Sequence, residues 1–124
     1  KNLVIEATIA SLEVNLNADK GIFFISGNSY PENSTEFFKP IMAWLNEYFS
    51  ANAQSLTIIN MEVVYFNSSS SRQLYEFFNL LHKNVLENKV QINWIYDEEN
   101  DAAEEAGEDF IDDFEDLNIQ MLIK

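Results

Sequence analysis

The sequence predicts a mixed α/β fold, with a sheet of five to six strands and about three helices in the order βββαβαβα(β). Three observations predict it. Short segments with strand-type apolar patterns open the chain, and residues 34–52 and 72–85 repeat apolar side chains at helical spacing. A strand-type segment follows each helical one, which implies parallel, right-handed crossovers. The 124 residues, 47% of them hydrophobic, are enough for one domain, residues 1–124, with a core of its own.

The first three strands are expected at Leu3–Ala7, Leu12–Leu16 and Ile22–Ser26, where apolar residues alternate or cluster. Asn17–Gly21 has turn composition and ends in a glycine that tolerates positive φ, so the second and third strands are expected to form a hairpin. Gly27–Asn33 is expected to be a loop.

The first helix is expected from Ser34, which is suited to be its N-cap, to about residue 52. Glu36 lies in the first turn, where the helix dipole favours an acidic side chain. Pro40 lies near the start of the pattern, where a proline removes few backbone hydrogen bonds. The apolar residues at helical spacing are Phe37, Phe38, Ile41, Leu45, Tyr48 and Phe49.

Leu56–Phe66 is a long apolar run without Gly or Pro, which favours a central strand covered on both faces. Asn67–Ser71 is a short polar break, and a second amphipathic helix is expected from Arg72. Its apolar stripe consists of Leu74, Phe77, Phe78, Leu81 and Val85.

The last part of the chain predicts a strand, a helix and a closing strand or extended segment. Val90–Tyr96 alternates as a strand does, and Leu117–Ile123 closes the fold. Between them, Asp101–Asp113 is acidic and helical in pattern, although Gly107 costs a helix about 1 kcal/mol relative to Ala.

The charge is concentrated in one segment. The net charge is −14, and twelve of the 21 acidic residues lie between Asp97 and Asp116, where there is no Lys or Arg. The rest of the chain is nearly neutral, so no basic surface is available for nucleic acid or an anionic membrane, and partners with basic surfaces are favoured.

Cysteine is absent, only three glycines are present, and no zinc or phosphate-loop motif occurs, so we expect no cofactor and no metal. No apolar run approaches the ~20 residues of a membrane span. We therefore expect a soluble, cytoplasmic protein.

The acidic segment partly imitates a calcium loop. Asp97, Glu99, Asp101 and Glu108 match ligand positions of an EF-hand, but Ala102 stands where the sharp turn needs Gly. A solvated acidic helix and a docking surface for a basic partner are the other two interpretations.

The polar break Asn67–Arg72 contains four consecutive serines. Short polar side chains at a strand–helix junction cap helices, and this structural role is one interpretation. The other is a phosphorylation site, because the carboxyl edge of an α/β sheet is exposed and a helix N-terminus favours an anion. His82, the only histidine, cannot be the general base for a Ser68 nucleophile. If both residues lie on one helix, about fourteen residues separate them, which is roughly 21 Å.

Tyr65–Arg72, with the sequence Tyr-Phe-Asn-Ser-Ser-Ser-Ser-Arg, resembles the Tyr-Phe-Asn-Thr-Ser-Ser-Lys/Arg signature of the SiaC family of bacterial regulatory phosphoproteins. Gly27–Asn33, Asn93–Asp97 and Glu104–Phe110 are similar to that family in the same order. The resemblance therefore extends over nearly the whole chain.

The resemblance implies a fold related to STAS anti-anti-sigma domains and a non-catalytic, partner-switching role. A Ser/Thr kinase would phosphorylate the protein and a PP2C-type phosphatase would reverse this. The unmodified form would bind and stimulate a diguanylate cyclase, in control of cyclic-di-GMP and biofilm formation. The family acceptor is commonly Thr, and Ser68 occupies the matching position here, with Ser69 and Ser70 as rival acceptors.

The residues expected to contact the partner surround Ser68 or lie in the Tyr-Pro-Glu turn. They are Asn67, Ser69, Ser70, Arg72, Tyr30, Pro31 and Glu32. A turn fixed by Pro31 before a helix is the structural alternative for the second group. For the whole protein, the alternative functions are an anti-anti-sigma-like antagonist that binds an anti-sigma kinase, and a hydrolase or calcium-binding protein.

Overall fold

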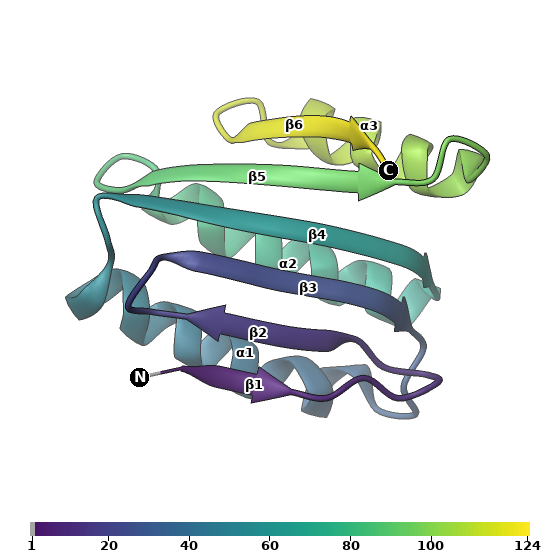
Figure 1. Ribbon diagram of the computed structural model, residues 1–124, viewed down its shortest axis with the longest axis horizontal. Coiled ribbons are helices and arrows are strands. Elements are labelled where there is room, and N and C mark those ends of the chain that lie inside the picture. The colour runs from purple at the N-terminus through teal and green to yellow at the C-terminus, as the bar shows by residue number, and fades with distance from the viewer. Residues whose placement is uncertain (1) are drawn as a thin grey trace.

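The computed structural model describes residues 2–124, apart from the side chain of Asn52. A six-stranded sheet carries three α-helices on one side (Figure 1). The elements in chain order are β1 (Leu3–Ile5), β2 (Glu13–Asn17), β3 (Ile22–Ser29), α1 (Ser34–Glu47) with a π-helical end η1 (Tyr48–Asn52), β4 (Leu56–Phe66), α2 (Ser68–Asn84), β5 (Lys89–Tyr96), α3 (Asp101–Asp113) and β6 (Asn118–Ile123). The predicted fold class and element order are confirmed.

The strands lie in the sheet in the same order as in the chain, β1-β2-β3-β4-β5-β6. β1, β2 and β3 pair antiparallel, and β3 to β6 pair parallel. The expected hairpin is present, and Gly21 in its turn has φ 66°, a backbone conformation that residues with a Cβ rarely adopt. Each parallel crossover moves one strand in the same direction, and right-handed crossovers then place every helix on the same face of the sheet.

The expectation that Leu56–Phe66 is covered on both faces is therefore wrong. Along β4, Thr57, Ile59, Met61 and Val63 are buried beneath the helices, whereas the residues between them are half-buried or exposed. Alternation with this period is the pattern of a strand with one covered face. The other face of the sheet carries no helix and is turned toward the viewer in Figure 1.

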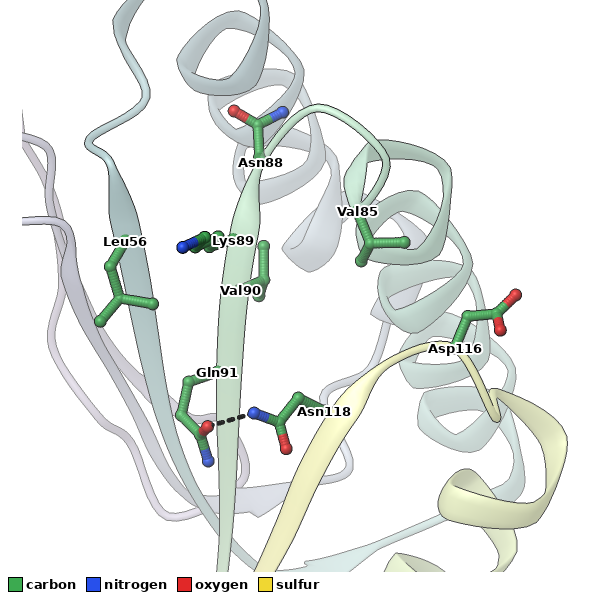
Figure 2. A pocket seen from close by; sticks show the side chains of 8 residues that line it. All are labelled: Leu56, Val85, Asn88, Lys89, Val90, Gln91, Asp116 and Asn118. Carbon is green, nitrogen blue, oxygen red and sulfur yellow. Dashed lines mark hydrogen bonds between the residues drawn. The ribbon is translucent and has the colours of Figure 1, made fainter.

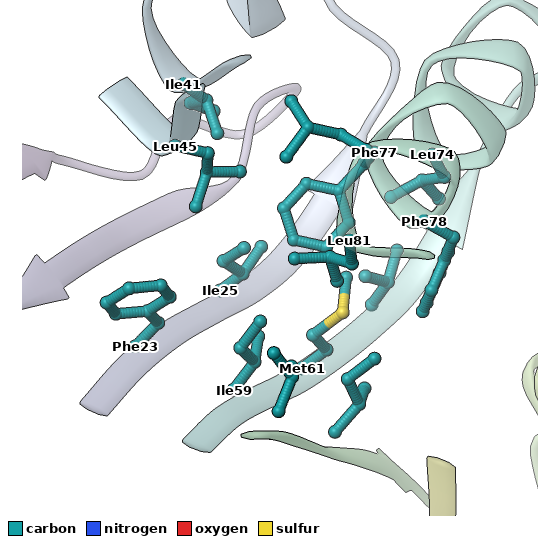
Figure 3. Close-up of a cluster of buried hydrophobic side chains, with 14 of the residues drawn as sticks. Phe23, Ile25, Ile41, Leu45, Ile59, Met61, Leu74, Phe77, Phe78 and Leu81 are labelled. Atoms are coloured by element: carbon teal, nitrogen blue, oxygen red, sulfur yellow. The ribbon is translucent and has the colours of Figure 1, made fainter. Parts of the chain in front are cut away.

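The core fills the space between the sheet and the helices. Phe23 and Ile25 of β3 and Ile59 and Met61 of β4 meet side chains of α1 and α2 (Figure 3). The helix residues labelled there are Ile41, Leu45, Leu74, Phe77, Phe78 and Leu81, and all six are buried. No helix among residues 2–124 has both the length and the apolar character needed to cross a membrane.

α3 approaches the sheet closely through Gly107. A Cβ on Gly107 would lie 2.5 Å from the Met121 sulfur and 2.6 Å from Cδ1 of Trp94. The Trp94 indole N–H also donates to the carbonyl oxygen of Ala103, at 2.9 Å. The glycine therefore reflects close packing rather than a break in the helix.

Candidate functional site

Three helices begin at one edge of the sheet, and each has an asparagine N-cap. Asn33, Asn67 and Asn100 accept a hydrogen bond from the backbone N–H three residues later, at 3.1, 2.9 and 3.1 Å. The expected N-cap Ser34 is thus displaced by one residue, to Asn33. The second helix begins at Ser68, four residues before Arg72, where its apolar pattern starts, so the serines form its first turn.

The serine segment lies beside the end of β3. The Asn67 backbone N–H donates to the Ser29 carbonyl oxygen, at 3.1 Å, which brings the loop after β3 against the start of α2. The starts of α1 and α2 are also joined by side chains, since the Gln73 amide donates to the Thr35 hydroxyl at 3.3 Å. The sequence-predicted segments 27–33 and 67–72 therefore form one surface.

The candidate acceptor serines have different environments. Ser68 is the first residue of α2 and is exposed, and its hydroxyl makes no hydrogen bond within the described part of the chain. Ser69 is exposed, but its hydroxyl is bonded to that of Ser34. Ser70 is 0% exposed and accepts from the Ser29 hydroxyl at 2.8 Å. Only Ser68 offers an accessible, unengaged hydroxyl of these three.

The start of α2 also lacks negative charge. Its first turn holds no acidic residue, whereas Glu36 lies in the first turn of α1 and Asp101 and Glu104 lie in that of α3. Arg72 is exposed four residues after Ser68, so its side chain lies on the same helix face and leans toward the N-terminus. Arg72 forms no ion pair with any other residue in the range 2–124.

Exposed aromatic side chains border the serine segment. Tyr30 and Tyr65 meet edge to face, with ring centroids 5.8 Å apart, and are 38% and 55% exposed. Pro31 is half-buried and Glu32 is exposed in the turn that follows Tyr30. Asn67, half-buried, is engaged as the cap of α2.

Tyr65 is a surface residue that we did not predict as a contact. The register between β3 and β4 shifts after Gly27, so that Gly27 pairs with Val63 and Asn28 with Tyr65. The unpaired residue, Val64, is on the open face in the alternation that precedes it. After this irregularity Tyr65 is exposed, although the same alternation would turn it toward the helices. Nothing in the apolar pattern of this strand indicates the irregularity. The only sequence signal for Tyr65 is its position at the start of the motif Tyr65–Arg72, which resembles the SiaC family.

The acidic residues at this edge of the sheet lie around the end of β5 and on α3. The Asn100 side chain donates to the Val64 carbonyl oxygen at 2.9 Å, which fixes the start of α3 beside the irregularity in β4. Burial, followed by the charges of Glu104, Glu108 and Glu98, raises the pKa of the Tyr96 phenol above its ordinary value. The hydrogen bond and charge of Glu62, whose carboxylate lies 2.9 Å from the Lys124 amine, raise the pKa of Lys124.

Among residues 2–124, no three His, Asp or Glu side chains converge as metal ligands would. His82 is at the far end of α2, where Nε2 lies 3.3 Å from a carboxylate oxygen of Asp116. A hollow of about 300 Å³ nearby, lined by Val85, Lys89 and neighbouring side chains, is at the edge opposite Ser68 (Figure 2).

Comparison with known proteins gives consistent matches. Residues 5–124 match the model of the SiaC family regulatory phosphoproteins. An uncharacterized protein of Pseudomonas aeruginosa (strain UCBPP-PA14) is 32% identical over 94 residues, which are 75% of this chain and 74% of that protein.

Solved structures agree over the whole fold. Apo-SiaC from Pseudomonas aeruginosa has a TM-score of 0.86 and 26% identity, with 100% of this chain and 98% of that chain covered. A chain in the crystal structure of the diguanylate cyclase SiaD with its activator SiaC, from the same organism, has a TM-score of 0.90 and 25% identity, with 98% and 99% covered. The protein described here therefore belongs to the SiaC family of regulatory phosphoproteins.

Proposed function

We propose that this protein is a non-catalytic, partner-switching regulator controlled by reversible phosphorylation of Ser68. In the unphosphorylated form it binds and stimulates a diguanylate cyclase, and phosphorylation breaks that complex. A Ser/Thr kinase adds the phosphate and a PP2C-type phosphatase removes it. The protein acts in the cytoplasm, in the control of cyclic-di-GMP and biofilm formation.

The observation that carries this proposal is the exposed, unengaged Ser68 hydroxyl at the start of α2. A kinase reaches it without opening the fold, whereas Ser70 is fully buried and Ser69 is bonded to Ser34. Membership of the SiaC family supports the choice of partner, as does the structural similarity to SiaC of Pseudomonas aeruginosa, which is the activator of the diguanylate cyclase SiaD.

The domain itself tolerates the phosphate. At pH 7 a phosphoserine adds a charge of about −1.5 to −2, and the first N–H groups of a helix have no intrahelical acceptor. The start of α2 is free of carboxylates, and Arg72 lies one turn further on the same face. The new charge is thus placed where a positive dipole end and a guanidinium both favour it.

The phosphate on Ser68 weakens binding of the partner. Tyr30, Tyr65 and Arg72 are exposed around Ser68, and Tyr and Arg are the residue types that most often dominate binding energy at interfaces. Association with this surface would remove water from a phosphate dianion, which costs several kcal/mol unless the partner supplies its own cations. A loss of about 2.8 kcal/mol weakens binding roughly a hundredfold.

Phosphate incorporation from the cognate kinase tests the acceptor. We expect wild type and Ser69→Ala to take up one phosphate, measured by intact-protein mass spectrometry, and Ser68→Ala to take up none. Uptake of a full equivalent by Ser68→Ala would show that Ser68 is the wrong acceptor.

Binding and stimulation of the cyclase test the switch. We expect Ser68→Asp to weaken the complex at least tenfold, about 1.4 kcal/mol, by calorimetry and to reduce cyclic-di-GMP synthesis in the same proportion. The matched control is Asn46→Asp, which adds the same charge at an exposed position of α1 and should bind as wild type does. Equal binding by Ser68→Asp and wild type, or capture of an anti-sigma kinase in place of a cyclase, would contradict the proposal.

A further inference from the structure

The uncovered face of the sheet has an unusual composition for a surface of this protein. One row of residues crosses all six strands on this face without a charged side chain: Val4, Asn15, Phe24, Asn60, Asn93 and Gln120. The next row, from Asn17 to Asn118, is uncharged as well. Outside the acidic segment the chain still carries sixteen charged side chains, and none of them lies in these two rows.

The amide side chains of this face are bonded to one another. Asn93 donates to Asn60 at 2.9 Å, and Gln91 donates to Asn93 at 3.1 Å and to Gln120 at 3.3 Å. Asn118 donates to Gln91, as the dashed line in Figure 2 shows. Amides that already have partners lose less when water is removed, so this network is suited to being covered.

Apolar side chains lie among the amides. Phe24 is 54% exposed and Leu56 is 45% exposed on this face, and Ile22 and Ile58 beside them are half-buried. A mixture of uncharged polar groups and exposed apolar groups, depleted in charge at its centre, is typical of the core of a protein interface. Charged residues of the face flank the two uncharged rows: Glu13 and Glu62 lie in the row beside Asn60, where Glu62 is paired with Lys124, and Lys89 lies beside Leu56 on the other side.

We infer that this face binds a second copy of the same chain, related by a two-fold axis. A two-fold interface brings each surface against itself, so its groups must be self-complementary. An amide is both donor and acceptor and can pair with its own copy at the axis, whereas a charged side chain there meets the same charge. The acidic helix α3 lies behind the sheet (Figure 1), so two copies joined face to face keep their acidic segments on opposite outer sides.

The dimensions of the face agree with a weak dimer. The whole open face, with its charged margins, comprises six strands about 4.8 Å apart and about five residues of about 3.3 Å each, or roughly 500 Å² per copy. The total of about 1,000 Å² is at the low end of specific interfaces, among the weak and transient ones.

Sedimentation equilibrium over a range of concentrations tests this inference. We expect wild type to be in monomer–dimer equilibrium and Asn60→Asp to raise the dimer dissociation constant at least tenfold. This substitution keeps the shape of the side chain and the oxygen that accepts from Asn93, so the fold should be retained. Asn46→Asp, on the helix side, adds the same charge and should dimerise as wild type does.

A mixing experiment identifies the occupant as a second copy. Asn60→Asp and Asn60→Lys should each be monomeric alone and should form mixed dimers together, because opposite charges then meet across the interface. A wild-type chain that is monomeric at every concentration tested, or a dimer that Asn60→Asp leaves unchanged, would overturn the inference. So would a monomer whose binding to the cyclase is lost in Asn60→Asp, which would assign the face to that partner.

Discussion

The starts of α2 and α3 have the same backbone arrangement and opposite electrostatics. Both helices follow a parallel strand at the carboxyl edge of the sheet, and both have an asparagine N-cap that accepts from the third residue of the helix. The first turn of α3 contains Asp101 and Glu104, whereas that of α2 contains serines and no acidic residue.

This difference supports the proposal that the start of α2, rather than that of α3, is the phosphorylation switch. Carboxylates near the N-terminus of α3 already interact with its dipole, so additional negative charge there meets repulsion. At α2 the same favourable interaction is still available, and a phosphate on Ser68 would use it. The fold thus supplies several equivalent anion-favouring positions, and the local sequence decides which of them is permanently occupied by protein carboxylates.

The largest expected effect comes from the packing that holds α3 in place. Gly107→Ala removes a residue that is poor for helices, yet its methyl group would collide with Met121 and Trp94. Overpacking typically costs 1–3 kcal/mol, so we expect about 2 kcal/mol of lost unfolding free energy in urea denaturation despite the propensity gain. Asp109→Ala, at an exposed position of α3, should change stability by less than about 0.5 kcal/mol. A stabilised Gly107→Ala would show that α3 does not pack this closely.

Removal of the two N-cap side chains should lower the free energy of unfolding by different amounts. Asn67→Ala loses one capping bond and should cost about 1 kcal/mol. Asn100→Ala loses its capping bond and also the bond from its amide to the Val64 carbonyl oxygen, so about 1.5 kcal/mol is expected. Urea unfolding of both variants provides the comparison, and an equal or larger cost for Asn67→Ala would contradict it.

The smallest effect is the electrostatic one. Relative to Ser68→Asn, Ser68→Asp should stabilise the protein by about 0.5 kcal/mol, because it places a charge at the free end of α2. Relative to Ala102→Asn, Ala102→Asp should destabilise it by a similar amount, because Asp101 and Glu104 are already there. Thermal unfolding at low and at high salt is the measurement, and both differences should shrink as salt is added. If Asp changes the stability in the same direction at positions 68 and 102, the proposed electrostatic difference between the starts of α2 and α3 is contradicted.

Much of the fold could be predicted because apolar spacing is clear in most elements. The stripe from Leu74 to Leu81 and the alternation of Val90–Tyr96 led directly to α2 and β5. The covered face of β4 was misjudged because Ile58 and Val64 on the open side conceal the alternation with Asn60 and Glu62. Apolar residues on an open face cannot be separated from core residues by hydropathy alone.

The candidate site was predictable in position but not in detail. The serine run and its junction indicated the start of a helix, and the resemblance singled out Ser68. The pairing of Ser70 with Ser29 and of Ser69 with Ser34 depends on contacts between segments 35 to 41 residues apart, which local patterns do not reveal. These pairings, rather than the serine run itself, distinguish the three hydroxyls.

The unpaired residue in β4 has a consequence for how such regulators diversify. Before Val64 the strand is in phase with the core, so each substitution at a covered position disturbs packing. After Val64 the phase is shifted, and Tyr65 faces outward without any buried neighbour having to move. Under the proposed function, this end of the strand can therefore change its side chains, and with them the partner that it contacts, while the hydrophobic interior stays the same.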